Sequence, residues 1–361
     1  MVKSAYIHIP FCKSKCHYCS FVSFTDFSRK DEYLEAIESE IRHYYDGDIL
    51  NTLYIGGGTP SILNVFDFQR LVNLFNLSDG AEVTSELNPD DVSYDYMRGL
   101  YDAGINRVSF GCQTFNDNIL KAINRRHNAK QVHEAVDCAM SAGFNNISLD
   151  FIYGLPEQTQ EMFLEDLKRG AALGVSHISL YGLTLEKGSY FYENGFSDPD
   201  EDEMADMYLA AIETLAQLGY EHYEISNFSK PGYYSRHNMN YWNNEEYYGF
   251  GVSAHGYKNN VRYGNSTDLK EYIENPAVRE AEKLMTTRER LEEEIFLGFR
   301  RMSGINVDEI NTKFGIDFEE KYNSILKKYD GLRLLEKTAE GYKLSPNGIL
   351  VSNVILAEFL E

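Results

Sequence analysis

The chain has 361 residues, of which 43% are hydrophobic and 25% are charged, so a globular fold of one large domain or two is expected. Its formal net charge is −22 and no run is rich in lysine and arginine, which argues against a nucleic-acid partner. No stretch is long and apolar enough to span a bilayer, and the N-terminus lacks an apolar signal segment. The sequence therefore predicts a cytoplasmic protein that is not an integral membrane protein.

Three of the five cysteines stand close together near the N-terminus, as Cys12, Cys16 and Cys19. They follow an apolar, strand-like run over residues 5–9, so one short loop can aim three sulfurs at a common centre. Thiolates suit zinc or an iron–sulfur cluster, and both usually take four protein ligands. No fourth cysteine is near. His17 lies between Cys16 and Cys19, a position from which it is awkward to reach the same metal ion. A cluster with one iron left open is favoured, and a structural zinc site is the alternative.

Strand-like and helix-like stretches alternate from the first residues to residue 183. Strands are expected at residues 4–9, 52–55, 82–87, 107–113, 146–153 and 177–183, and helices at residues 29–45, 66–75, 94–103, 130–141 and 160–173. Repeats of about 30 residues are typical of βαβ units in a parallel sheet. The sequence thus predicts an α/β fold in which functional loops lie at the carboxyl ends of the strands.

Polar or glycine-rich positions gather at these expected strand ends. The run Gly-Gly-Gly-Thr-Pro at residues 56–60 follows the second strand, Glu86 ends the third and Gln113 the fourth. Glycines let the backbone approach a ligand, where N–H and C=O groups can hold the ammonium and carboxylate of an amino acid. Asp150 interrupts an apolar strand and needs a partner such as a ribose hydroxyl or a cationic ligand. The structural alternatives are a tight turn and solvent-facing residues at a barrel rim.

The second half of the chain does not continue the regular alternation of strands and helices. A helix is expected at residues 200–218 and a strand at 220–226, before a stretch rich in tyrosine and asparagine. Helices are expected at residues 287–300, after Asn306 and at residues 317–328, followed by a hairpin. We predict three domains: a barrel with the cysteine loop at residues 1–230, an extension packed on it at 231–285, and a small helical and winged-helix-like domain at 286–361.

The spacing C-x3-C-x2-C, with Tyr18 before the last cysteine, resembles the signature of the radical S-adenosylmethionine (SAM) superfamily. Together with Gly-Gly-Gly-Thr-Pro, Glu86-Leu-Asn-Pro, Ser109-Phe-Gly-Cys-Gln113 and Asp150-Phe-Ile-Tyr-Gly-Leu-Pro, it makes nearly the whole chain similar to the oxygen-independent coproporphyrinogen oxidase family. This resemblance implies a partial (β/α)6 TIM-like barrel of the radical SAM type. It also implies a [4Fe-4S] cluster on the three cysteines, whose fourth iron takes SAM. The residues that it places around SAM are Tyr6, Tyr18, Gly57, Gly58, Thr59, Glu86, Gln113, Arg125, Asp150 and Thr184.

Two departures from the true oxidases point to another branch of that family. Phe21 stands where the oxidases have a further cysteine, and Cys12 comes without their N-terminal extension of some tens of residues. Residues 236–242 contain H-N-x-x-Y-W, which resembles the hallmark of the heme-chaperone branch, and include the only tryptophan. An imidazole beside two aromatics offers heme an axial nitrogen and flat faces. His237 is therefore the predicted heme ligand. The other candidates are His8, His17, His127 and His255.

The resulting expectation is a carrier that has a SAM-coordinated cluster, binds heme and passes it to acceptor proteins in the membrane or cytosol. The alternative is an enzyme that decarboxylates coproporphyrinogen III, in which a reduced cluster splits SAM and the 5′-deoxyadenosyl radical abstracts a propionate β-hydrogen. That substrate has four carboxylates and calls for several arginines or lysines at the barrel mouth. Lysine and arginine together number only 34 against 56 acidic residues, so the carrier is favoured. A structural zinc protein is the third possibility.

Overall fold

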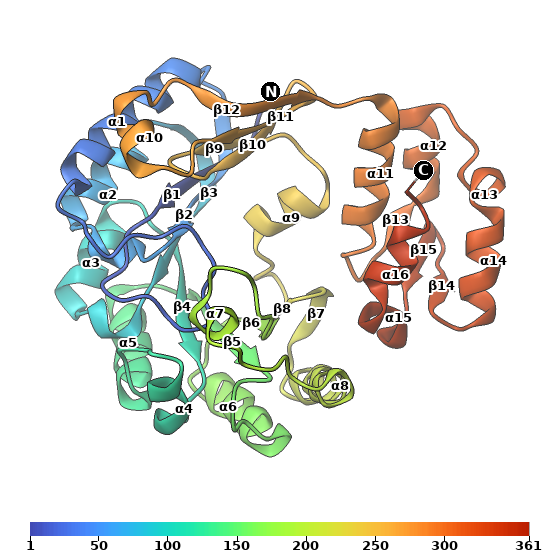
Figure 1. Cartoon of the computed structure of the whole chain (residues 1–361), viewed down its shortest axis with the longest axis horizontal. Coiled ribbons are helices and arrows are strands. Elements are labelled where there is room, and N and C mark those ends of the chain that lie inside the picture. The colour runs from blue at the N-terminus through green and yellow to red at the C-terminus, as the bar shows by residue number, and fades with distance from the viewer. Residues whose placement is uncertain (361) are drawn as a thin grey trace.

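Parallel strands form the centre of the fold and follow one another across the sheet in chain order. The computed structural model describes residues 1–360, and Figure 1 shows helices α1 to α6 around the outside of these strands. The strands are β1 (Ser4–Ile9), β2 (Ile49–Gly57), β3 (Asn76–Leu87), β4 (Arg107–Gln113), β5 (Asn146–Tyr153) and β6 (His177–Gly182). The helices between them are α1 (Lys30–Tyr44), α2 (Val65–Val72), α3 (Tyr94–Asp102), α4 (Asp117–Ala122), α5 (Ala129–Ala142) and α6 (Gln160–Ala172). The predicted α/β fold class is confirmed.

Short strands extend this sheet at both edges, so that it has nine strands in the order β7-β8-β6-β5-β4-β3-β2-β1-β9. β7 (Glu221–Glu224) and β8 (Asn227–Ser229) run antiparallel next to β6, and β9 (Tyr248–Phe250) runs parallel to β1. Because β7 and β9 are not paired with each other, the barrel is partial, as the sequence predicts. β9 was not predicted, because it has only three residues in a stretch rich in glycine and tyrosine. So short a run shows no alternation of apolar and polar side chains.

Side-chain alternation gives the sheet one apolar and one polar face. In β1, Ile7 and Ile9 are fully buried against the helices, whereas Tyr6 and His8 point to the opposite face, the barrel interior. β5 repeats this pattern, with Leu149 among the helices and Asp150 on the inner face. The polar residues that interrupt the apolar strands are therefore directed into the barrel.

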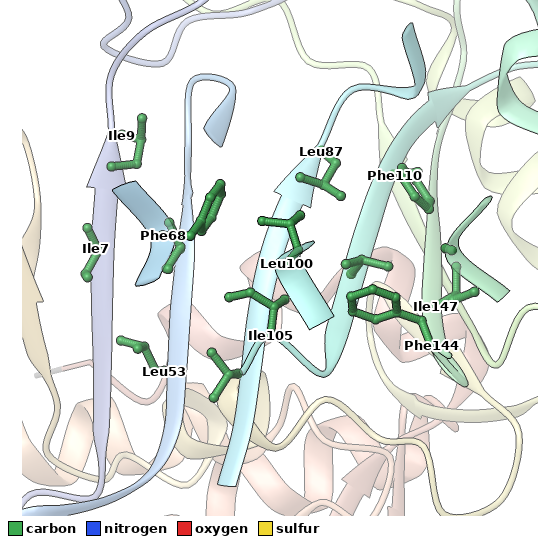
Figure 2. Packing of buried hydrophobic residues seen from close by; sticks show 14 of the residues in the cluster. Ile7, Ile9, Leu53, Phe68, Leu87, Leu100, Ile105, Phe110, Phe144 and Ile147 are labelled. Carbon is green, nitrogen blue, oxygen red and sulfur yellow. The ribbon is translucent and has the colours of Figure 1, made fainter. Parts of the chain in front are cut away.

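Aliphatic and aromatic side chains fill the space between the sheet and the outer helices. Figure 2 shows Leu53 of β2 and Phe110 of β4 on the same face of the sheet as Phe68 of α2 and Leu100 of α3. Phe68, Leu100, Leu53 and Phe110 are all fully buried. Fully burying such a side chain stabilises a fold by about 1.5–3 kcal/mol, so this layer holds the strand ends, and with them the site, in fixed positions.

The remaining elements lie beyond the sheet edges. Residues 183–286 contain α7 (Tyr190–Glu193), α8 (Glu201–Gln217), α9 (Arg236–Trp242) and α10 (Leu269–Glu274), and a small sheet of β10 (His255–Lys258), β11 (Val261–Asn265) and β12 (Arg279–Leu284). The C-terminal unit, defined here as residues 286–360, contains α11 (Thr287–Gly298), β13 (Ile305–Asn306), α12 (Val307–Phe314), α13 (Phe318–Lys321), α14 (Asn323–Gly331), β14 (Leu335–Lys337), β15 (Gly341–Leu344), α15 (Pro346–Leu350) and α16 (Ser352–Ala357).

The C-terminal unit supplies almost all of a second hydrophobic cluster, to which α8 adds Tyr208. The helix predicted at residues 317–328 is interrupted at Tyr322, so α13 and α14 are separate. The predicted hairpin is confirmed as β14 and β15, and β13 joins it to make a three-stranded sheet. The domain boundaries at residues 230 and 285 stay predictions. Within residues 1–360, no helix combines the length and the apolar character that crossing a membrane requires.

A buried carboxyl group ties α1 to the segment that contains β9 to β11. Glu40 is fully buried and accepts hydrogen bonds from the Gly251 N–H at 2.8 Å, from Asn265 Nδ2 at 2.6 Å and from the Tyr272 hydroxyl. Burial raises the pKa of Glu40 to about 7, although these hydrogen bonds act in the opposite direction. Near neutral pH the folded chain therefore keeps a proton that an exposed glutamate has lost.

This proton makes the free energy of unfolding depend on pH. Between its ordinary pKa of 4.5 and about 7, Glu40 is protonated in the folded chain and ionised in the unfolded chain, so stability falls as pH rises through this interval. We expect Glu40→Gln to remove this contribution, about 3 kcal/mol at most, and to flatten the dependence measured by urea unfolding. Substitution of the exposed Glu280 by Gln is the control. An unchanged pH dependence in Glu40→Gln would contradict the assignment.

Candidate functional site

The three clustered cysteines lie in a loop that follows β1 at the carboxyl end of the barrel. Backbone hydrogen bonds close the loop at its base, from the Phe24 N–H to the Pro10 carbonyl at 2.7 Å and from the Cys12 N–H to the Phe24 carbonyl at 3.0 Å. A turn joins the Cys19 N–H to the Cys16 carbonyl at 3.2 Å. All three thiols are free and face one cavity of about 470 Å³.

The same cavity collects most of the residues predicted to surround SAM. Besides the cysteines, its lining includes Tyr18, Gly57, Gly58, Thr59, Glu86, Gln113, Arg125, Asp150 and Thr184. They come from the loop after β1, from the ends of β2 to β6 and, for Arg125, from the segment between α4 and α5, so the fold brings together positions far apart in the chain. Sequence reasoning missed other lining residues, among them Asn88 and Tyr181, and named His127, which also lines the cavity, only as a candidate heme ligand.

The glycine turn packs directly against the cysteine loop. Gly57 has φ +116°, and a Cβ atom there would lie 2.6 Å from the ring of His8. A Cβ atom on Gly58 would lie 2.8 Å from the carbonyl oxygen of Phe11. Neither position has room for a side chain, which explains the glycines. The hydroxyl of Thr59 donates to Cys12 Sγ at 3.3 Å, so the turn also contacts a sulfur.

Arg125 connects the cysteine loop to the sheet. Its Nη2 donates to the Gly111 carbonyl at 2.6 Å and to Asn88 Oδ1 at 2.8 Å, and its Nη1 donates to Cys16 Sγ at 3.6 Å. Its Nε is buried and has no hydrogen-bond partner within residues 1–360. A guanidinium fixed at the cavity wall places positive charge beside the thiols and next to any ligand in the cavity.

Two carboxyl groups line the inner wall of the cavity. Glu86 accepts hydrogen bonds from the Tyr54 hydroxyl at 2.8 Å and the Gly57 N–H at 3.0 Å, and burial raises its pKa to about 7. The Ser109 hydroxyl lies 2.9 and 3.0 Å from the two oxygens of Asp150, whose pKa burial also raises. Both groups can accept hydrogen bonds from hydroxyl or ammonium donors, and a cation in the cavity would favour their charged forms.

Two predicted site residues lie outside this cavity. Tyr6 points into the barrel from β1, where its hydroxyl pairs with His8 Nδ1 at 3.0 Å. His237 lies in α9 and is 1% exposed. Its Nδ1 is 2.8 Å from Thr52 Oγ1, near the amino end of β2, whereas the glycine turn lies at the carboxyl end of that strand. The structure therefore does not bring His237 together with the cysteines.

The other candidate heme ligands differ in their surroundings. His8 is buried and both of its ring nitrogens have partners. His17 is partly exposed and its Nδ1 lies 2.9 Å from the Ala122 carbonyl. His127 lines the cavity, with Nε2 on a backbone carbonyl and Nδ1 buried without a partner among the described residues. His255 is exposed at the start of β10.

The donor set fits a cluster with a small polar ligand beside it. Three thiols stand at the rim of a cavity whose volume is in the usual range of about 300–1,000 Å³ for small-molecule sites. Cysteine sulfur is the usual ligand of iron–sulfur clusters, and in a [4Fe-4S] cluster each cysteine binds a separate iron. Among residues 1–360, no three His, Cys, Asp or Glu side chains are grouped as ligands of a single metal ion.

Comparisons with known proteins match both ends of the chain. The radical SAM superfamily model matches residues 6–170, and the HemN C-terminal domain model matches residues 285–351. Heme chaperone HemW of Lactococcus lactis subsp. lactis is 38% identical, over 99% of this chain and 97% of its own length. Heme chaperone HemW of Bacillus subtilis is 37% identical, over 99% of this chain and 99% of its own.

A solved structure agrees with the fold. The coproporphyrinogen III oxidase HemN of Escherichia coli, described as a radical SAM enzyme, superposes with a TM-score of 0.86 at 24% identity, over 99% of this chain and 90% of its own. This likeness concerns the fold. Because the relatives from Lactococcus and Bacillus match almost the whole chain in sequence, this chain belongs to the HemW heme chaperone family of the radical SAM superfamily.

Proposed function

We propose that this chain binds heme in the cytoplasm and transfers it to heme-accepting proteins there or at the membrane. The observation that carries the proposal is the similarity to heme chaperones over 99% of the chain. Phe21, which stands where the oxidases have a further cysteine, also supports a carrier rather than an oxidase. The acceptor proteins are part of the proposal and are defined only as proteins that need heme.

We also propose that Cys12, Cys16 and Cys19 hold a [4Fe-4S] cluster and that SAM occupies the cavity beside it. When bound, such a cluster supplies an open iron and an electron to the sulfonium of SAM. The glycine turn lines the cavity and offers its backbone groups to the methionyl end of the ligand, and Glu86 can accept from its ammonium. Asp150 can accept from ribose hydroxyls, and Gln113, Thr184 and Tyr18 complete the polar wall. Tyr6, outside this lining, pairs with His8 inside the barrel.

Thr59 and Arg125 act on the sulfurs rather than on the ligand alone. Both donate to cysteine sulfurs, Thr59 to Cys12 and Arg125 to Cys16. Hydrogen bonds to sulfur stabilise the more negative, reduced form of an iron–sulfur cluster. These two side chains therefore orient the thiols and make the site easier to reduce.

The cysteines can be tested one at a time. We expect Cys16→Ala and Cys19→Ala to lose most of the iron, the sulfide and the visible absorbance of anaerobically reconstituted protein. Cys138→Ala is the matched control, because Cys138 is a free cysteine in α5, away from the cavity. Full iron and sulfide content in Cys16→Ala would rule out the proposed cluster site.

Heme binding and enzymatic decarboxylation can be separated on one sample. We expect anaerobic titration with heme to give a stoichiometric Soret band. The same protein, supplied with dithionite, SAM and coproporphyrinogen III, should form no protoporphyrinogen. Formation of protoporphyrinogen without heme binding would instead support an oxygen-independent oxidase. Under this proposal His237 is the first heme ligand to test, and His237→Ala should change the Soret band.

A further inference from the structure

The imidazole of His237 is neutral and has a defined proton arrangement. The Thr52 hydroxyl donates to Ser4 Oγ at 2.9 Å, so it accepts from His237 Nδ1 at 2.8 Å. The lone pair therefore lies on Nε2, which is 2.9 Å from the Tyr241 hydroxyl. Burial, with a smaller contribution from the nearby Arg107, lowers the pKa of His237 to about 3. In this arrangement Nδ1 already donates a hydrogen bond, and Nε2, the nitrogen that could bind a metal, is covered by the hydroxyl of Tyr241.

The amino end of α9 is firmly attached to the barrel. The His237 N–H donates to Glu82 Oε1 at 3.0 Å, and Arg236 Nη2 donates to the carbonyls of Asn51 at 2.8 Å and Gly80 at 2.9 Å. These bonds reach β2 and β3 directly, so residues 236 and 237 are fixed whatever happens at the other end of the helix.

The carboxyl end of α9 is attached instead to the C-terminal unit. The Arg300 guanidinium lies 4.5 Å from the ring centre of Trp242, and Arg301 Nη1 donates to Asn243 Oδ1 at 2.6 Å. Asn244 Nδ2 adds a 3.2 Å hydrogen bond to a carboxylate of α11. Because Tyr241 directly precedes Trp242 in α9, a movement of Trp242 together with the C-terminal unit would shift the covering hydroxyl.

Two buried donors weaken this attachment. Trp242 Nε1 and Arg300 Nε are both buried and have no hydrogen-bond partner within residues 1–360. A buried donor without a partner costs about 1–3 kcal/mol relative to the same donor in water. Moving Trp242 and Arg300 apart would let water reach both donors. The contact therefore holds α9 closed, but opening it costs less free energy than opening a fully hydrogen-bonded interface would.

We propose that Tyr241 caps the iron-binding nitrogen of His237, and that the contact between Trp242 and Arg300 keeps this cap closed until heme binds. The inference rests on the proposed heme-binding function and concerns the regulation of its ligand. When the carboxyl end of α9 moves away, Nε2 becomes free while Nδ1 still donates to Thr52. Metal-bound histidines usually keep such a hydrogen bond at the second nitrogen. The motif H-N-x-x-Y-W thus contains the ligand, its cap and the residue that holds the cap.

Tyr241→Phe tests the cap with little loss of packing, because only the hydroxyl is removed. Losing one hydrogen bond of about 1 kcal/mol from the closed state should raise the rate of heme association about fivefold, as measured by stopped-flow absorbance. The increase should disappear in the double variant Tyr241→Phe with His237→Ala. Circular dichroism and iron content, measured on every variant, check that the fold and the cluster are unchanged.

Arg300→Met tests the contact that keeps the cap closed. Methionine keeps the aliphatic packing but removes the guanidinium from Trp242, so heme association should again become several-fold faster only when His237 is present. Arg288→Met is the matched control, because Arg288 lies in α11, the helix that ends two residues before Arg300, is largely exposed and forms an ion pair with Glu292 on the surface.

The possible outcomes separate this inference from the proposed function. Rates equal to wild type in both Tyr241→Phe and Arg300→Met would overturn it. Faster binding that persists in the His237→Ala background would also overturn it, because the iron would then be bound elsewhere. Wild-type protein that takes up no heme would contradict the proposed function. If Tyr241→Phe also took up none, the cap would be overturned as well, since the uncovered nitrogen would not bind iron.

Discussion

Alternation of side chains along parallel strands is the constraint on which the rest of this structure depends. Every second residue of β1 to β6 packs against helices, and the residues between them face the barrel. The apolar layer therefore fixes the heights and directions of the polar side chains, including Glu86 and Asp150. A shift of one residue in β3 or β5 would bury Glu86 or Asp150 among aliphatic side chains and turn an apolar side chain into the cavity.

Much of the fold and of the cavity could be predicted from the sequence, because both follow from regular patterns. The bounds of β4 and β5 agree with the alternation of residues, and the strand-end rule brought Glu86, Gln113 and the cysteines to one cavity. β9 escaped prediction because it is short and gains its stability from pairing with β1. Tyr6 was predicted to contact SAM but lies outside the cavity lining, because depth inside a barrel depends on strand tilt, which no local pattern reports.

The placement of His237 shows the limit of arguing from a motif. A histidine beside two aromatics has the chemistry of a heme ligand, and that chemistry is the same wherever the motif lies in the fold. Its position depends on contacts with Thr52 and Glu82, which lie more than 150 residues earlier in the chain. A single sequence gives no sign of such long-range contacts. The motif therefore predicts which residue could bind heme iron, but not that its side chain is buried and hydrogen-bonded in the fold.

The pairing of β1 with β9 has a consequence for synthesis of the chain on the ribosome. The strand that leads into the cysteine loop is among the first segments to emerge, but one of its edges has no neighbour until Phe250 has left the exit tunnel. An uncovered strand edge readily pairs with other chains. Completion of the sheet, and with it rigid support for the cysteine loop, therefore comes late in translation, when most of the polypeptide is already outside.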